Sequence, residues 1–228
     1  MGKRFRSLLT GLLLAWAAPA LTSQTWAAVP TAKSVAKTPA AKPQGAKPTT
    51  SADQSDRVMG NTNAPITIIE YGSVACPICA RFNDTVMPDL KAKYIDTGKA
   101  KYILRPMLTG VSTIAMAGTR LAECAGNDRY YAVIDSVMRA QSEYYAMGEN
   151  DMLVRPVLLR IAKSYGLDEA AYYKCVLDEK GNAVLNQKNQ SYLGQGIDRT
   201  PTFVINGKPF AYKGGGLAEF DAAIAAAQ

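Results

Sequence analysis

A short β-forming run leads directly into two closely spaced cysteines, and this junction limits the folds open to the chain. Residues Ile66–Tyr71 are mostly apolar and β-branched, which predicts a buried strand. The segment Cys76–Cys79, of sequence Cys-Pro-Ile-Cys, follows at once and opens a predicted helix whose apolar face includes Cys79 and Phe82. Two thiols are therefore expected at a strand-to-helix turn.

The remaining apolar patterns predict an α/β protein in which a helical block separates two groups of strands. Residues 100–107 form a second strand candidate, and about four helices are expected between residues 112 and 194. Asn206-Gly207 lies between two β-rich runs, which predicts a type I′ hairpin. Three further expectations are a kink at Pro88, a helix N-cap at Asp168 and a final helix over residues 217–224.

The position of the cysteine pair accounts for its expected chemistry. A thiol at a helix N-terminus lies near unpaired backbone N–H groups and the positive end of the helix dipole, which favour the thiolate. Pro77 suits the first helical position, where its missing N–H costs nothing. We expect Cys76 to be the exposed, attacking sulfur. Cys79, on the apolar face, is expected to be the shielded sulfur that resolves a mixed disulfide.

The chain has 228 residues, with four cysteines and no histidine. The missing histidine excludes Ser-His-Asp and Cys-His catalysis, histidine-ligated zinc and haem held by a histidine. One CxxC pair with two distant cysteines is a poor zinc pattern, so we expect no metal and no cofactor. Cysteine chemistry is then the strongest candidate for function.

The net charge of +7 comes from the N-terminal part of the chain. Residues 1–50 carry seven of the 26 basic residues and no acidic residue, which leaves 19 basic and 19 acidic residues from residue 51 onward. A folded part that is neutral overall offers no excess of positive charge to nucleic acid, and we expect no nucleic-acid partner.

Residues 1–28 have the pattern of an export signal: a basic start, an apolar run from Leu8 to Leu21, and small residues that suit cleavage. The alternative is an uncleaved membrane anchor, although the run is short for a bilayer span. We therefore expect an exported, periplasmic protein in a compartment where disulfides persist.

Residues 29–57 are rich in proline, alanine and lysine and hold no aromatic residue, which predicts an extended cationic linker. A spacer in solvent and a tether to an anionic surface both fit this composition. The folded domain is expected over residues 58–228, and the helical block is expected to be an insertion at about residues 112–195.

Three segments resemble the DsbA-like thiol–disulfide oxidoreductases, a branch of the thioredoxin superfamily. They are Glu70–Cys79, the lead-in from Gly60 to Pro65, and Thr200–Gly207, which reads Thr-Pro-Thr-Phe-Val-Ile-Asn-Gly. The resemblance covers about residues 58–228 and implies a thioredoxin fold with an inserted helical domain. It also implies an enzyme, a protein thiol–disulfide oxidoreductase.

The resemblance further implies a substrate-binding loop. In thioredoxin-like folds the proline that matches Pro201 follows a cis peptide bond beside the cysteine pair, and the residue before it, here Thr200, pairs with an extended substrate. Pro77 and Ile78 are expected to contact the same substrate. The alternative is an ordinary trans proline that opens a strand.

A buried acid six residues before the first cysteine is also common in the family. The resemblance assigns this role to Glu70, whose carboxyl we expect to have a raised pKa and to exchange a proton with Cys79. The alternative is a glutamate paired at a strand end.

Two residues depart from the family pattern. Ile78 stands where the best-known oxidases have histidine, so we expect a less depressed pKa for Cys76 and a less oxidising disulfide than in those relatives. Arg199 stands where glycine is common before Thr-Pro. It either brings positive charge near the site or points to solvent.

The other two cysteines, Cys124 and Cys175, lie in the helical block, and in an exported protein we expect them to form a structural disulfide. On a chain-entropy model, such a bond stabilises the fold by about 4 kcal/mol. Two free buried thiols and joint zinc binding with the CxxC pair are the alternatives.

The function expected from these features is disulfide exchange with exported proteins, through a mixed disulfide on Cys76 that Cys79 resolves. Oxidation is favoured over isomerisation and reduction, although the sequence leaves the direction open. An oxidase would need a membrane redox partner to re-oxidise it, and we expect a monomer. The alternatives are a periplasmic holdase and a Cu(I) carrier that use the same cysteine pair.

Overall fold

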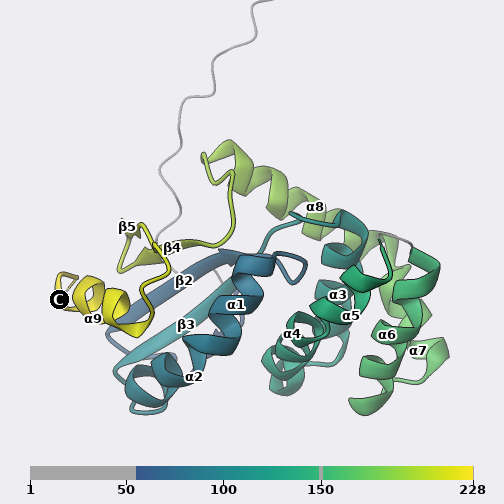
Figure 1. Cartoon of the computed structure of the whole chain (residues 1–228), viewed down its shortest axis with the longest axis horizontal. Coiled ribbons are helices and arrows are strands. Elements are labelled where there is room, and N and C mark those ends of the chain that lie inside the picture. Colours follow the sequence, from purple (N-terminus) through teal and green to yellow (C-terminus); the bar gives the residue numbers. More distant parts are fainter. Residues whose placement is uncertain (1–54, 149–150, 228) are drawn as a thin grey trace, which may run out of the picture. The chain divides into compact units, whose positions relative to one another are not determined.

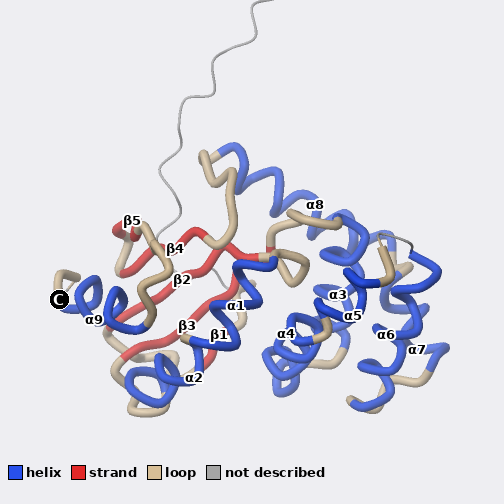
Figure 2. Tube along the Cα trace, viewed as in Figure 1, coloured by secondary structure: helices blue, strands red, loops and turns tan. Residues whose placement is uncertain are grey.

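The computed structural model describes residues 55–148 and 151–227, so the expected export signal and most of the expected linker lie outside the described residues. A five-stranded mixed sheet of order β1-β3-β2-β4-β5 forms the centre of the fold, and helices pack against it (Figure 1 and Figure 2). The strands are β1 (Val58–Met59), β2 (Ile66–Gly72), β3 (Ala100–Pro106), β4 (Thr202–Ile205) and β5 (Lys208–Phe210).

Strand β2 lies in the middle of the sheet, and its pairing explains where the site forms. It runs parallel to β3 and antiparallel to β4, with Tyr71 opposite Thr202. The end of β2 therefore lies beside the start of β4. This pairing brings Thr200 and Pro201, which precede β4, next to the turn that follows β2.

The predicted hairpin joins β4 to β5. Asn206 (φ 45°) and Gly207 (φ 81°) both have positive φ, as a type I′ turn requires, and the prediction is confirmed. The Asn206 side chain also accepts a hydrogen bond from the Thr67 N–H at 2.8 Å. The hairpin is thereby tied to the start of β2, at the opposite end of that strand from the cysteines.

One face of the sheet is covered by α1, α2 and α9 (Figure 1). Their bounds are α1 (Pro77–Thr85), α2 (Met87–Leu90) and α9 (Leu217–Ala225), and a π-helical turn, Lys91–Ile95, continues α2. Phe82 lies at the centre of this packing, with ring centroids 4.8 Å from Phe203 and 5.4 Å from Phe220. This aromatic cluster fixes α1, and with it the cysteine motif, on the sheet.

The predicted kink at Pro88 is wrong, because Pro88 lies at the start of a new helix and not inside a continuous one. Helix α1 ends at Thr85, and a second helix begins at Met87 with Pro88 in its first turn. A proline there leaves no helical hydrogen bond unmade, because the first N–H groups of a helix have no intrahelical partner.

The helical insertion lies between β3 and β4. It comprises α3 (Ser112–Cys124), a 3-10 turn (Asn127–Arg129), α4 (Tyr130–Arg139), α5 (Gln141–Ala146), α6 (Asp151–Ser164), α7 (Glu169–Val176) and α8 (Glu179–Gly194). The expectation of about four helices is wrong, because a break at Ala140 and N-caps at Asp168 and Asp178 divide the helical pattern. The predicted N-cap at Asp168 is confirmed. None of the described helices is long and apolar enough to cross a bilayer.

The opposite face of the sheet packs against the C-terminal end of α8. Ile69 and Tyr71 point to this face, where the rings of Tyr71 and Tyr192 lie 5.0 Å apart. Because side chains alternate along a strand, Glu70 points to the other face, on the side of α1.

A buried ion pair joins the segment before β1 to β3. The Arg105 guanidinium on β3 lies 2.8 Å from the Asp56 carboxylate, and the two side chains are 3% and 6% exposed. Arg105 also donates to the Tyr71 hydroxyl at 2.8 Å. The C-terminal end of the expected linker, at Asp56, therefore contacts the folded domain.

Candidate active site

Cys76 occupies the N-cap of α1, and Pro77 follows in the first turn of the helix. The backbone at Cys76 is extended (φ −91°, ψ 120°), and its N–H donates to the Ser73 carbonyl at 3.0 Å. The turn after β2 thus leads the sulfur to the helix N-terminus, where backbone N–H groups are unpaired. Both cysteines of the motif are free thiols in this structure, and Cys79 is fully buried.

Cys76 is less exposed than the sequence predicts. The residue is only 7% exposed, because the loop before β4 packs over the sulfur and the thiol donates to the Thr200 carbonyl at 3.5 Å. The Thr200-Pro201 peptide bond is cis. Pro77 and Ile78 are exposed, Ile78 by 53%, so the surface beside the sulfur is apolar.

The surroundings of Cys76 favour its thiolate. A hydrogen bond from the Cys79 thiol is the largest effect that lowers the pKa of Cys76 to about 5. Burial opposes this shift, while the Thr200 side chain and the N–H groups of Cys79 and Ile78 reinforce it. Burial raises the pKa of Cys79 well above its usual value. Cys79 therefore keeps its proton under conditions in which Cys76 has lost one.

Glu70 lies on β2 beneath the cysteine pair and is 1% exposed. Burial raises the pKa of its carboxyl to about 7, and hydrogen bonds from Tyr102 and Cys79 limit the rise. The Tyr102 hydroxyl donates to Glu70 Oε2 at 2.5 Å. The predicted direction of the pKa shift is confirmed. Near neutral pH this carboxyl can gain or lose a proton beside Cys79.

A loop that the sequence does not reveal also joins the site. The Thr109 hydroxyl lies 2.8 Å from the Thr200 hydroxyl, and the Ser73 hydroxyl donates to the Thr109 carbonyl at 2.8 Å. The next residue, Gly110, has φ 76°, and a Cβ there would lie 2.6 Å from the Ala75 carbonyl oxygen. The sequence signal for this close approach is a glycine in the loop that follows β3.

Arg199 is not part of this cluster. Its side chain is 82% exposed and pairs with the neighbouring Asp198 at 3.1 Å. Of the two expectations for Arg199, the structure supports the one in which its side chain points to solvent. Although Arg199 directly precedes Thr200, its side chain does not face the sulfur of Cys76.

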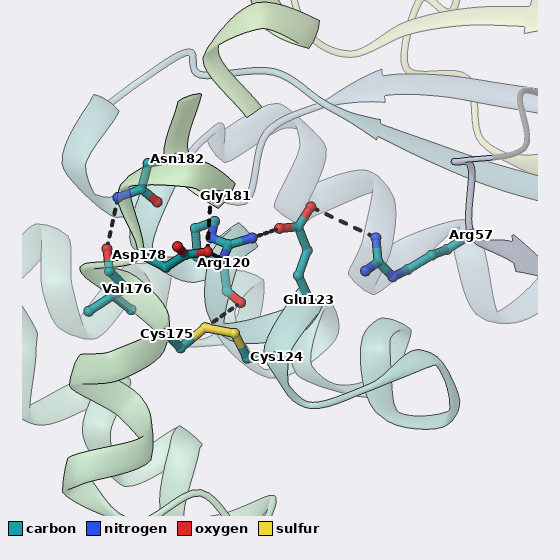
Figure 3. The surroundings of a disulfide bond; sticks show 9 residues. All are labelled: Arg57, Arg120, Glu123, Cys124, Cys175, Val176, Asp178, Gly181 and Asn182. Atoms are coloured by element: carbon teal, nitrogen blue, oxygen red, sulfur yellow. Dashed lines mark hydrogen bonds and ion pairs between the residues drawn. A yellow bond between two sulfur atoms is a disulfide. The ribbon is translucent and has the colours of Figure 1, made fainter. Parts of the chain in front are cut away.

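The second cysteine pair lies within the insertion. Cys124, at the end of α3, forms a disulfide with Cys175 on α7, and their Cα atoms are 6.2 Å apart. Figure 3 shows the charged groups around it: Arg120 pairs with Glu123 and with Asp178, the N-cap residue of α8. The disulfide and these charges tie α3, α7 and α8 together. Within residues 55–148 and 151–227, no three cysteine or acidic residues are placed to hold a metal ion.

Sequence comparisons identify the family of the chain. The family described as Thioredoxin matches residues 52–225. A Rickettsia conorii protein with the provisional name protein-disulfide oxidoreductase is 30% identical over 173 residues, which cover 75% of this chain and 60% of that protein. The chain thus spans less than two thirds of the length of this relative.

Solved structures share the same fold. Wolbachia pipientis alpha-DsbA1 matches with a TM-score of 0.68 at 27% identity, over 77% of this chain and 92% of that one. Oxidised BdbD from Bacillus subtilis matches with a TM-score of 0.65 at 20% identity, over 75% of this chain and 92% of that one. The fold class predicted from the sequence, a thioredoxin fold with an inserted helical domain, is confirmed.

Proposed function

Because this chain belongs to the thioredoxin family, in its DsbA-like branch, we propose that it is a thiol–disulfide oxidoreductase that exchanges disulfides with exported proteins. The setting of Cys76 carries the proposal. Its thiol lies at a helix N-terminus, has a pKa lowered to about 5, and contacts the Thr200-Pro201 segment. A thiolate in this setting is both a ready nucleophile and a good leaving group.

The exchange proceeds through a mixed disulfide. In the oxidising direction, a substrate thiolate attacks Cys76 Sγ, the Cys76–Cys79 bond breaks, and Cys79 leaves as a thiolate that takes up a proton. A second substrate thiolate then attacks the substrate sulfur of the mixed disulfide and expels the Cys76 thiolate. The substrate loses two electrons as its disulfide forms, and the cysteine pair gains them.

The residues around the pair have separate roles in this mechanism. Glu70 supplies the proton that Cys79 takes up and accepts it in the reverse direction, which suits a carboxyl whose pKa is about 7. The backbone of Thr200 pairs with the extended substrate, and Pro201 holds that loop beside the sulfur. Ile78 and its neighbour Pro77 offer an exposed apolar surface to the same substrate.

We infer that the enzyme works as an oxidase rather than as an isomerase or reductase. A stabilised Cys76 thiolate lowers the free energy of the reduced form, and this makes the disulfide a stronger oxidant. The reduced enzyme then needs a membrane partner that accepts two electrons. The pattern of residues 1–28 supports export to the periplasm, and we propose that the enzyme acts there as a monomer.

Cys79→Ser tests the mechanism directly. In this variant Cys76 can still attack a disulfide but no sulfur can resolve the adduct, so mixed disulfides with a model substrate should accumulate on Cys76 and be visible by mass spectrometry. Cys76→Ser is the control and should form no adduct and catalyse no exchange. Exchange that persists in Cys76→Ser would contradict the proposal. Binding of unfolded protein or Cu(I) without exchange would favour a holdase or a carrier.

The reduction potential of the Cys76–Cys79 couple decides the direction. The potential can be measured by equilibrating the protein with glutathione and trapping its free thiols. An oxidase should have a potential nearer to about −120 mV, whereas a reductase should lie near about −270 mV. A value in the second range would reverse the inferred direction and leave the exchange chemistry in place.

A further inference from the structure

The turn that leads to Cys76 is held by side chains from a distant part of the chain. Gln141, in α5 of the insertion, is 6% exposed and donates through Nε2 to the Val74 carbonyl at 2.8 Å and to the Cys76 carbonyl at 3.0 Å. The Tyr144 hydroxyl donates to the same Val74 carbonyl at 2.9 Å. One short helix, α5, therefore donates hydrogen bonds to the carbonyl groups of Val74 and Cys76.

Tyr145 completes the set, because its hydroxyl donates to the Ala75 carbonyl. Three consecutive carbonyl groups that lead into α1, those of Val74, Ala75 and Cys76, thus accept hydrogen bonds from side chains of α5. All three of these residues are buried. A carbonyl oxygen is the negative end of a peptide dipole, so a carbonyl near Cys76 disfavours a negative sulfur to the extent that hydrogen-bond donors do not offset its charge. Each donor of α5 offsets part of this effect.

We propose that Gln141 and Tyr144 are positioning residues for disulfide exchange, which hold the peptide groups around Cys76 with their carbonyl oxygens directed at α5. This inference rests on the proposed function, because it explains how the cysteine pair is tuned for exchange. Both residues act through the backbone of the turn. The helical insertion thereby takes part in the chemistry of a motif that belongs to the thioredoxin fold.

Loss of these donors should disfavour the thiolate and leave the fold in place. The pKa of Cys76 should rise, and the disulfide should become less oxidising, because the reduced form loses stabilisation. In Gln141→Leu, the Val74 carbonyl keeps the Tyr144 hydroxyl, and the Cys76 carbonyl keeps the Ala80 N–H at 3.0 Å. Each carbonyl loses one of its two donors, so its negative charge is less well offset near the sulfur, and it keeps the other donor, so a folded variant is expected.

The test compares Gln141→Leu with Asn182→Leu in the full chain. Asn182 is a matched control, because its side-chain amide also donates to a backbone carbonyl in the insertion, that of Val176 at 3.0 Å (Figure 3). Each protein is equilibrated with glutathione, and the thiolate absorbance of its reduced form is titrated with pH. Gln141→Leu should shift the equilibrium about tenfold toward the disulfide and raise the pKa of Cys76. Asn182→Leu should change the equilibrium by less than about twofold.

Tyr144→Phe is the second probe, and it decides the test if Gln141→Leu does not fold. It removes one hydroxyl and keeps the ring, and it should move the equilibrium in the same direction by about threefold. Tyr165→Phe is its control, because the Tyr165 hydroxyl donates to the Ala132 carbonyl at 2.9 Å elsewhere in the insertion.

Two outcomes separate the positioning role from the proposed function. Equal equilibria in Gln141→Leu and Asn182→Leu, from a parent protein that exchanges with glutathione, would overturn the positioning role alone. A parent protein that does not exchange with glutathione would overturn the proposed function itself.

Discussion

Glu70 places an ionisable carboxyl in the interior of the sheet, and the cost of its burial depends on pH. The pKa of Glu70 is about 7 in the folded protein, against 4.5 for an unperturbed carboxyl. The stability that goes with the neutral carboxyl is therefore complete below about pH 4.5 and is lost as the pH rises through 7. The same pKa near neutrality suits a group that exchanges a proton with Cys79.

Glu70→Gln should remove the pH-dependent cost and weaken exchange. Relative to the parent, the unfolding free energy of the reduced variant should rise by about 3 kcal/mol between pH 4.5 and pH 8, because an amide does not ionise. The amide oxygen can still accept a hydrogen bond from Tyr102, so the fold should persist. The step in which Cys79 loses its proton should slow about a hundredfold. Urea unfolding across this pH range measures the difference in unfolding free energy between variant and parent, and a difference that does not change with pH would contradict the prediction. Stopped-flow exchange measures the rate of the step in which Cys79 loses its proton.

Ile78 gives the neighbouring sulfur no hydrogen-bond donor from its side chain. An imidazole in its place can donate a hydrogen bond and adds positive charge when protonated. Ile78→His should lower the pKa of Cys76 and shift the glutathione equilibrium about tenfold toward the dithiol, a rise of about 30 mV. Ile78→Leu is the control for the change in shape. An unchanged or lower potential in Ile78→His would show that this position does not tune the sulfur.

At the scale of elements, the sequence predicts structure wherever nearby residues decide the backbone. The run Ile66–Tyr71 becomes β2, because apolar, β-branched residues suit a strand buried on both faces. Asn206-Gly207 makes its turn through two residues that tolerate positive φ, and Asp168 caps α7 through a carboxylate three residues from its partner. Each of these features depends on residues a few positions apart.

The contacts that complete the site could not be predicted in this way. The hydroxyls of Thr109 and Thr200 meet across 91 positions, and Gln141 reaches the Val74 carbonyl across 67. No period or spacing in the sequence records such a distance, which is set by the order of strands and by the packing of the insertion. Strand β1 has only two residues, too few for a pattern, and forms by pairing with β3.

The two aspartate N-caps of the insertion allow a test of how helix α8 is held. Asp178 caps α8 and pairs with Arg120 at 2.8 Å, whereas Asp168 caps α7 by accepting from the Ala171 N–H. Asp178→Ala should lower the unfolding free energy by about 2 kcal/mol, and Asp168→Ala by about 1 kcal/mol, since Asp168 contributes a cap without that ion pair. Urea unfolding of the two variants measures the difference. Equal losses would mean that the pair with Arg120 adds nothing to the cap.

For the whole molecule, the two cysteine pairs have separate tasks. The Cys124–Cys175 bond links residues 51 positions apart and lies within the insertion, so its removal should act on stability. The double variant Cys124→Ala/Cys175→Ala should unfold with about 4 kcal/mol less free energy on the chain-entropy model. Its Cys76–Cys79 pair should keep its equilibrium with glutathione within about twofold. A large change in that equilibrium would show that the two pairs are coupled.

The salt bridge between Asp56 and Arg105 has a practical consequence for anyone who expresses this domain alone. A recombinant fragment that begins at residue 55 retains the carboxylate, while one that begins at residue 57 keeps Arg57 but leaves the Arg105 guanidinium in the protein interior without the carboxylate of Asp56. Loss of one partner of a buried pair typically costs about 3–5 kcal/mol, so the shorter fragment should melt at a clearly lower temperature. The cloning boundary is therefore decided by one aspartate that precedes the first strand.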